Sequence, residues 1–264
     1  MKAGINVWTW GVQSREPFEQ GVKEASDIGY QAVETLGSVV FFYEDCPDEF
    51  ETLLAQHGVE FACAYHHLSG DWDKDFSNAQ RILKFLGEHD VPVMNLQAGR
   101  RAEGGPDEAA LKETASQARQ IGEFAREHGV AVCLHPHYAT NVEREHELAY
   151  MMDNVAPDVL SLTLDTAHTV LGGMDPVAMF AKYAKRVGYV HMKDILPQAA
   201  DDTGPWWSGF RELGRGLVNF PAIVRILDDA GYAGVLCVEL DRPRICGYKS
   251  AAISRAYIRE ELGI

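Results

Sequence analysis

The stretch VCLHPHYAT, residues 132–140, indicates how the chain is built. An apolar run over residues 130–134 ends in His135, Pro136 and His137. A strand that is buried on both faces, as in a parallel sheet, has such a continuous apolar run. We therefore expect the two histidines at the point where a buried strand emerges from one end of its sheet.

Three later apolar runs end in the same way. Each includes at least one side chain that commonly binds metal ions. The runs are LSLTLDTAH (160–168) with Asp165 and His168, VGYVHMKD (187–194) with His191 followed by Lys193, and GVLCVELD (234–241) with Glu239 and Asp241. In a parallel sheet the carboxyl ends of the strands lie on the same side, so these side chains are expected to converge.

Short apolar runs alternate with longer amphipathic segments along the whole chain. The runs centre on Ile5, Val33, Ala62, Val93, Val132, Leu162, Val190 and Leu236. The amphipathic segments cover residues 16–28, 47–57, 75–89, 107–128, 142–154, 175–185, 220–230 and 250–262. Eight strand–helix units predict a single (β/α)8 TIM-barrel domain over residues 1–264. An open doubly wound sheet is the alternative, but it does not explain metal-ligand side chains on four strand ends.

Composition excludes several classes of protein. The formal net charge of −15 argues against binding to nucleic acid. No segment approaches the roughly 18 unbroken apolar residues of a membrane span, and the first residues lack the apolar core of a signal peptide. Five cysteines without a CxxC pair favour reduced core thiols. We expect a cytoplasmic protein without membrane or nucleic-acid partners.

Two imidazoles and two carboxylates form the predicted metal site. His135, Asp165, His191 and Glu239 close the fifth to eighth strands. This set suits a divalent cation, with Mn²⁺ favoured and Mg²⁺, Co²⁺ and Zn²⁺ as alternatives. Each residue alone is often a structural hydrogen-bonding group, so the prediction depends on the four together.

The same motifs resemble a known family, the sugar phosphate isomerase/epimerase proteins (xylose isomerase-like TIM barrels, AP endonuclease family 2). The matching elements are LTLDTAH (162–168), VHMKD (190–194), ELGRGLVNF (212–220) and GYAGVLCVEL (231–240). The resemblance implies that Asp165, His191 and Glu239 bind metal and that His168 contacts substrate oxygen near it. It also implies a homo-oligomer. Glu34, at the end of the second strand, matches a position where the family often has Glu.

The chain departs from the ketose epimerases of this family at the fifth strand. Those proteins have a Glu there that binds metal and acts as one of two opposed acid/base groups, whereas this chain has His135. The pattern HPHYAT (135–140) is similar to the HPH-x-GT of inosose dehydratase-like members, which also have the HxKD found here at residues 191–194. Epimerisation by two carboxylates is therefore in doubt.

The predicted function is a metal-dependent isomerase or epimerase of a keto-sugar, and the alternative is a dehydratase of a keto-cyclitol or keto-sugar. The resemblance implies that Glu239 is the catalytic base, and because a metal-bound carboxylate is a weak base, His137 and His168 are alternatives. Lys193 either stabilises an oxyanion, protonates a leaving hydroxyl, or forms only an ion pair with Asp194 or Glu239.

Aromatic and polar residues near the strand ends are the predicted substrate contacts. Trp8 ends the first strand, and the long segment 196–217 contains Trp206 and Trp207, which suit a pocket wall or a subunit contact. Of His66 and His67, one is expected to face inward, and His67 is the predicted contact. The full set of predicted substrate contacts is His168, Trp8, Glu34, His67, Trp206 and Trp207.

Three further functions are disfavoured by particular features. The turn LGRG (213–216) lacks the spacing of a phosphate-binding loop, which favours an unphosphorylated substrate. A nuclease needs basic rims that the acidic chain lacks. A sugar-binding barrel without catalysis would have no need for Asp165, His191, Glu239 and Lys193 together.

Overall fold

Eight parallel strands close into a barrel in the computed structural model, which describes residues 1–197, 204–243 and 245–264. The strand order around the barrel is β1-β10-β7-β6-β5-β4-β3-β2. The barrel strands are β1 (Lys2–Asn6), β2 (Ala32–Leu36), β3 (Glu60–His67), β4 (Val93–Gln97), β5 (Ala131–Leu134), β6 (Ser161–Asp165), β7 (Val187–Met192) and β10 (Val235–Val238). Each predicted strand centre lies in one of them, and the predicted (β/α)8 barrel is confirmed.

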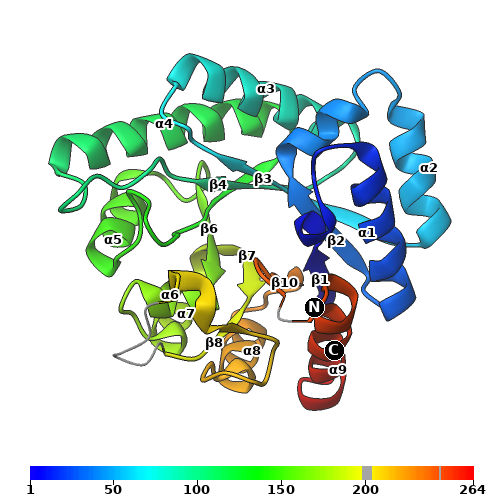
Figure 1. Cartoon of the computed structure of the whole chain (residues 1–264). Coiled ribbons are helices and arrows are strands. Elements are labelled where there is room, and N and C mark those ends of the chain that lie inside the picture. Colours follow the sequence, from blue (N-terminus) through cyan, green and yellow to red (C-terminus); the bar gives the residue numbers. More distant parts are fainter. Residues whose placement is uncertain (198–203, 244) are drawn as a thin grey trace.

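Helices cover the outside of the barrel (Figure 1). They are α1 (Arg15–Ile28), α2 (Pro47–His57), α3 (Trp72–Glu88), α4 (Glu108–Glu127), α5 (Glu145–Asn154), α6 (Thr166–Leu171), α7 (Pro176–Tyr183), α8 (Phe220–Asp229) and α9 (Gly247–Glu261). All eight predicted helical segments are present. The last helix, α9, packs beside β1, so the two ends of the chain lie near each other (Figure 1).

Several helix boundaries differ from the prediction because of local hydrogen bonds. Helix α3 starts at Trp72 rather than Asp75, because the side chain of Asp71 accepts the Lys74 N–H and caps the helix earlier. Helix α5 starts three residues later than predicted, since Thr140 accepts the Val142 N–H within the preceding turn. Four 3₁₀-helices were also not predicted, and they are η1 (Val7–Trp10), η2 (Gly37–Phe42), η3 (Ala184–Arg186) and η4 (Trp206–Gly209).

The long segment after β7 contains a small hairpin. Strand β8 (Asp194–Ile195) pairs antiparallel with β9 (Phe210–Arg211), and residues 198–203 lie outside the described residues. The buried Asp194 carboxylate accepts backbone N–H groups from Gly216 at 2.7 Å and Val218 at 3.1 Å. A Cβ on Gly216 would lie 2.2 Å from Asp194 Oδ1, so the turn requires glycine there. The LGRG turn thus binds a carboxylate of its own chain.

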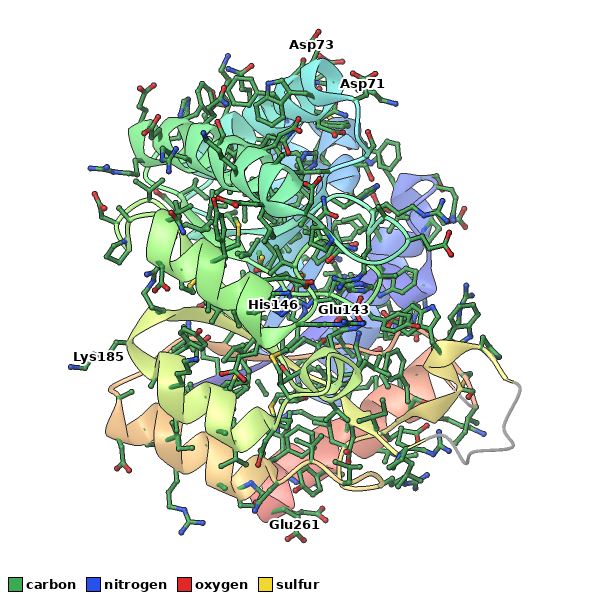
Figure 2. The ribbon with its side chains drawn as sticks, turned by 90° about the vertical axis from the view of Figure 1, so that its left-hand side faces the viewer. Asp71, Asp73, Glu143, His146, Lys185 and Glu261 are labelled. Carbon is green, nitrogen blue, oxygen red and sulfur yellow. The ribbon has the colours of Figure 1, made fainter. Side chains whose placement is uncertain are left out.

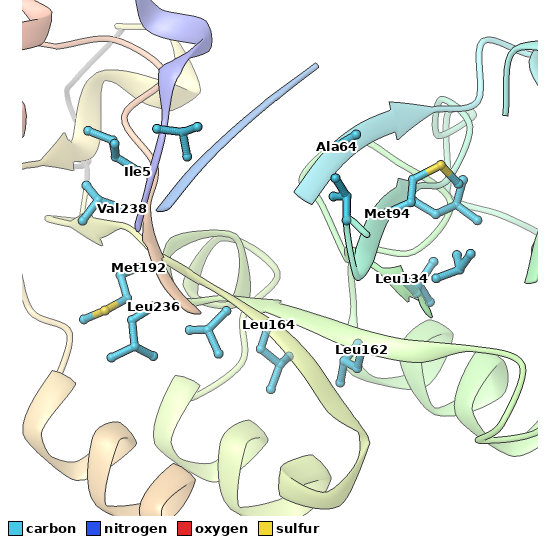
Figure 3. Close-up of a cluster of buried hydrophobic side chains, with 14 of the residues drawn as sticks. Ile5, Ala64, Met94, Leu134, Leu162, Leu164, Met192, Leu236 and Val238 are labelled. Carbon is cyan, nitrogen blue, oxygen red and sulfur yellow. The ribbon is translucent and has the colours of Figure 1, made fainter. Parts of the chain in front are cut away.

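The barrel separates two apolar regions. Between strands and helices lies the larger core, which includes Leu134, Leu162 and Leu236, and Figure 3 shows these side chains on the helix-facing side of their strands. Burial of each such side chain contributes about 1.5–3 kcal/mol to folding. The floor of the barrel interior holds a second set, Ala32, Ala62, Cys63, Val93, Cys133, Tyr189, Val235 and Cys237. Three of the five cysteines lie there, and none of the five forms a disulfide within the described residues.

Many charged side chains lie on the outside of the molecule. Asp71, Asp73, Lys185 and Glu261 project from its outline in Figure 2. Among the helices that the structure describes, none combines the length and the apolar composition needed to cross a membrane.

Candidate metal centre and pocket

The four predicted metal ligands come together at the carboxyl end of the barrel. Asp165 and His191 lie on β6 and β7, and His135 and Glu239 directly follow β5 and β10. One donor atom from each lies within 4.8 Å of those of the other three, and all four side chains are buried. Ligand bonds of about 2.0–2.2 Å place donor atoms around one ion within about 4.5 Å of one another. The spacing therefore matches a single divalent cation.

The individual distances place His191 at the middle of the group. Its Nδ1 lies 3.1 Å from Glu239 Oε2, 3.3 Å from His135 Nε2 and 3.9 Å from Asp165 Oδ2. His135 Nε2 lies 3.7 Å from Asp165 Oδ2. Two nitrogens and two oxygens from four adjacent strands thus face one small volume.

Two buried carboxylate oxygens in this group accept no hydrogen bond from the described residues. They are Asp165 Oδ2 and Glu239 Oε2. The other oxygen of Asp165 accepts the His168 N–H at 2.7 Å and caps α6. Lys193 Nζ lies 2.7 Å from Glu239 Oε2 and forms an ion pair with it. Asp165 Oδ2 lies 3.5 Å from the same ammonium and accepts no hydrogen bond, which is costly for a buried oxygen, and a bound cation would satisfy it. The residues therefore fit a divalent metal.

A hydrogen bond fixes the ring of His135. The Tyr65 hydroxyl donates its single proton to Gln97 Oε1, so it can only accept from His135 Nδ1, which lies 2.9 Å away. Nε2 of His135 is then unprotonated and faces Asp165 and His191. Tyr65 and Gln97 were not predicted as site residues.

The protonation states suit metal binding. Burial lowers the pKa of His135, and the nearby Asp165 opposes this shift only in part, which keeps the ring neutral. Burial alone would raise the pKa of Glu239, but Lys193 and His191 hold it well below its usual range. Neutral imidazoles and ionised carboxylates are the forms that coordinate a cation. Burial alone would lower the pKa of His191, but Glu34 and Glu239 raise it well above its usual value, so a cation would displace a proton from this ring.

Lys193 is fully buried beside this group. Its Nζ lies 2.7 Å from Glu239, 2.9 Å from Asp241 and 3.5 Å from Asp165. Burial alone would lower the pKa of Lys193, but these carboxylates together raise it, so the side chain is an ammonium. Of the two ion-pair partners considered from the sequence, Glu239 is observed, whereas Asp194 is occupied by backbone N–H groups of the LGRG turn.

His137, His168 and Trp206 pack against one another at the edge of the site. The ring centroids of the two histidines lie 3.7 Å apart, and Trp206 lies 5.7 Å from His168 and 5.8 Å from His137. Burial lowers the pKa of His137 to about 3 and that of His168 well below its usual range. His168 Nε2 accepts from Lys193 Nζ at 3.2 Å, which joins these rings to the metal-ligand group.

A pocket of about 250 Å³ opens beside the four ligands. Its walls are formed by Asn6, Trp8, Leu36, Tyr65, Gln97, His137, Trp206, Trp207, Glu239, Asp241 and Arg242. The predicted contacts Trp8, Trp206 and Trp207 are among them, as are the predicted catalytic residues His137 and Glu239. A concave, mostly apolar wall with a few polar groups is typical of a small-molecule site.

Three predicted substrate contacts, Glu34, His67 and His168, are not among the residues that line this pocket. Glu34 is completely buried inside the barrel, where its carboxylate binds His191 and Asn95. His67 is exposed at the end of β3 and lines a separate surface hollow with Lys74.

Of the two histidines that end β3, His66 faces away from the barrel interior. The inward positions of β3 near the mouth are Cys63 and Tyr65, whereas His66 packs against α3, where its Nε2 donates to the Asp75 carbonyl at 3.0 Å. Alternation within the strand pointed to Tyr65. Polar Asn95 and Gln97 in the otherwise apolar β4 gave a similar signal that was not used.

The closed parallel barrel and the ligand group at its mouth define the class of protein, an α/β barrel with a candidate divalent-metal centre. The chain belongs to the family of xylose isomerase-like TIM barrels, which it matches over residues 22–262.

Relatives and solved structures agree with this assignment. The inosose dehydratase of Lacticaseibacillus casei is 32% identical over 251 residues, which cover 85% of this chain and 82% of the relative. The D-psicose 3-epimerase of Clostridium cellulolyticum H10, solved with D-tagatose, has a TM-score of 0.80 at 16% identity and covers 100% of this chain and 99% of its own. The IolI protein, solved with a zinc atom, has a TM-score of 0.80 at 14% identity, with coverage of 98% and 97%. At such identities the two structures show the shared fold alone.

Proposed function

We propose that this chain is a divalent-metal-dependent lyase that removes water from a keto-cyclitol or a related keto-sugar. The observation that carries the proposal is the state of His135. Its Nδ1 is engaged by Tyr65, and its Nε2 faces Asp165 and His191 in the ligand group. With Nε2 bound to a cation and Nδ1 donating to Tyr65, the ring would have no nitrogen left to transfer a proton, so the second acid/base carboxylate expected of an epimerase at this strand end has no replacement there.

An elimination needs a base for one proton and an acid for the leaving hydroxyl. A divalent cation held by the four ligands would polarise the substrate carbonyl and acidify the neighbouring C–H bond. Glu239 lines both the ligand group and the pocket, and it is the base that we assign to that proton. Lys193, held as an ammonium, is the acid that we assign to the hydroxyl on the next carbon.

The contact between Glu239 and Lys193 allows both residues to regain their starting protonation states after the elimination. Glu239 takes the proton from the α-carbon, a C=C bond forms, and the C–O bond of the β-hydroxyl breaks. Lys193 protonates the leaving group, which departs as water. The proton on Glu239 then passes to the Lys193 amine across the 2.7 Å contact and restores both residues. The products are an enone and one water.

The pocket suits an uncharged ring. Trp8, Trp206 and Trp207 provide aromatic faces for the C–H faces of a six-membered ring. The LGRG turn is occupied by Asp194, which agrees with the expectation of an unphosphorylated substrate. The name of the 32% identical relative, inosose dehydratase, supports this substrate class.

A keto-sugar isomerase or epimerase, the function first predicted from the sequence, is the second candidate. It shares the removal of a proton next to the carbonyl. His137 lines the pocket together with Glu239, and it is the group that would return the proton from another direction. This role would require a direct contact between His137 and the substrate carbon.

The two candidates are distinguished by their products. Protein stripped of metal is reloaded separately with Mn²⁺, Mg²⁺, Co²⁺ or Zn²⁺ and incubated in D₂O with inososes and ketohexoses. We expect ultraviolet absorbance of an enone from an inosose, with proton NMR signals of the dehydrated ring. The metal-stripped protein serves as the control.

Other outcomes would contradict the proposal. A new diastereomer with deuterium at one carbon and no enone would favour the isomerase or epimerase. Turnover that is equally fast in the metal-stripped protein would contradict the metal centre.

A further inference from the structure

Glu34 is a buried carboxylate that the proposed reaction does not use. It lies at 0% exposure inside the barrel, below the ligand group and away from the pocket. Its Oε2 lies 2.8 Å from His191 Nε2, and its Oε1 accepts from Asn95 Nδ2 at 3.1 Å. Both oxygens are therefore engaged by neighbours inside the barrel, and neither is free to bind a molecule in the pocket.

Thr163 fixes the direction of these hydrogen bonds. Its hydroxyl donates to Asn95 Oδ1. If the Asn95 amide were turned around, its oxygen would face Glu34 Oε1, and two acceptors would oppose each other at 3.1 Å. The amide nitrogen of Asn95 therefore points to Glu34. All of these side chains are completely buried, so no bulk water competes with the bonds.

The same geometry defines the tautomer of His191. An ionised carboxylate has no proton to donate, so the 2.8 Å contact with Glu34 requires a proton on Nε2 of the ring. Asn95 Nδ2 lies 3.2 Å from this nitrogen, a longer distance that fits two donors lying side by side. Once a cation displaces the other ring proton, Nδ1 of the neutral ring carries the lone pair. It faces Glu239 Oε2 at 3.1 Å and His135 Nε2 at 3.3 Å.

We propose that Glu34 is a positioning residue for the metal centre. It holds His191 as the Nε2–H tautomer with Nδ1 directed at the cation, and Asn95 and Thr163 hold Glu34 in turn. A carboxylate that accepts from the second nitrogen of a ligand histidine orients the ring and raises its basicity. This inference rests on the metal centre of the proposed function, but it concerns metal affinity and not the reaction catalysed.

The test is the Glu34→Gln variant, which keeps the size of the side chain. Its amide offers one acceptor where the network needs two, so either Asn95 or His191 faces an N–H group. We expect the affinity for Zn²⁺ and for Mn²⁺, measured by isothermal titration of metal-stripped protein, to fall about 10–100-fold.

Glu212→Gln is the matched control. Glu212 is 2% exposed, and its carboxylate accepts a hydrogen bond from the Ser250 hydroxyl at 2.7 Å. Neither residue belongs to the metal-ligand group. The same substitution there removes an equally buried charge, and we expect the metal affinity of the wild-type protein.

The possible results distinguish an error about the role of Glu34 from an error about the metal centre. Wild-type protein that binds neither ion would contradict the metal centre. Wild-type protein that binds metal, together with a Glu34→Gln variant of equal affinity and native circular dichroism, would overturn the role of Glu34. If the variant does not fold, ¹⁵N NMR of the histidine rings in zinc-loaded wild-type protein decides the question. We expect a proton on Nε2 of His191 and zinc on Nδ1, and the reverse assignment would overturn the inference.

Discussion

At the scale of single residues, the buried ammonium of Lys193 is the most consequential charge in the site. Replacing it in Lys193→Met leaves Glu239 and Asp241 without their cationic partner. Removing one member of a buried ion pair costs about 3–5 kcal/mol, and we expect a loss of this size from the free energy of unfolding of the metal-stripped protein in urea. Loss of the acid should also reduce kcat for elimination by about 10²–10⁴-fold.

The control for this prediction is Lys182→Met. Lys182 pairs with Glu145 at 2.9 Å, but both side chains are about half exposed. Exposed pairs contribute about 0–1 kcal/mol, so neither stability nor kcat should change appreciably. Full elimination activity in Lys193→Met would refute its role as the acid.

His66 gives the stability a dependence on pH. Burial, with a smaller effect of His67, lowers its pKa from 6.5 to about 4 against the opposing pull of Asp75. The native ring is therefore neutral, and the unfolded chain binds one proton more between these two pH values. Its contribution is complete above pH 6.5 and is lost as pH falls to 4, by about 3 kcal/mol in total.

The His66→Gln variant tests this dependence. The difference in unfolding free energy between pH 7 and pH 4 should be smaller in the variant than in the wild type. His146→Gln, at a ring that is 70% exposed, should keep the wild-type difference. Identical pH dependence in all three proteins would contradict the shift at His66.

The sequence predicted which side chains come together at the mouth of the barrel, but not how deep inside the barrel each side chain lies. His135, Asp165, His191 and Glu239 were grouped because strand ends converge, and the structure brings them together. Glu34 was predicted to reach the substrate, but it is directed below His191. The depth of a side chain inside the barrel depends on how far its strand is shifted along the neighbouring strands. Each residue of shift moves it by about 3.3 Å, and the sequence of one strand does not reveal this shift.

At the scale of elements, the Asp194 side chain organises the segment that carries the tryptophans. Its carboxylate accepts three backbone N–H groups, from Ile195 at 2.9 Å, Gly216 at 2.7 Å and Val218 at 3.1 Å. In the Asp194→Asn variant the side-chain NH₂ group replaces one carboxylate oxygen, so at least one of these backbone N–H groups loses its acceptor. Hydrogen bonds to a charged acceptor contribute about 1.5–3 kcal/mol each, and we expect destabilisation of about 3 kcal/mol with altered fluorescence of Trp206 and Trp207.

Asp175→Asn is the control for this element. Asp175 caps α7 by accepting the Val177 N–H at 2.8 Å, and Asn is an equally good cap. We expect unchanged stability there. If Asp194→Asn were as stable as Asp175→Asn, the anchoring of the segment would have to come from other contacts.

Long periodic elements were predictable and short ones were not. The segment 47–57 matches α2 at both ends, because Pro47 starts the helix and Gly58 ends it in the left-handed conformation. Helix α6 has only six residues, and β8 and β9 have two each. Such lengths are too short for a period to be recognised, and their formation depends on contacts such as the Asp165 cap and the Asp194 anchor.

At the scale of the whole molecule, the regular repetition of strand–helix units made the barrel predictable. Its closure depends on the pairing of two strands that lie at opposite ends of the chain. β1 pairs with β10, with Lys2 opposite Val235 and Ile5 opposite Val238. No local pattern contains this pairing, and it follows from the number of strand–helix units. On its other side β10 pairs with β7, so the four ligands come from a continuous half of the barrel wall.

A cation at this position would link β5, β6, β7 and β10 at one point, and global stability should therefore depend on metal. At a free metal concentration of 100 times Kd, a site that exists only in the native state adds about 2.7 kcal/mol. For a chain of this size that corresponds to a rise in Tm of about 5–10 °C over protein kept in chelator, measured by calorimetry. His135→Ala lacks one ligand and should show a much smaller rise at the same metal concentration. A Tm that does not respond to saturating Mn²⁺, Mg²⁺, Co²⁺ or Zn²⁺ would contradict the metal centre.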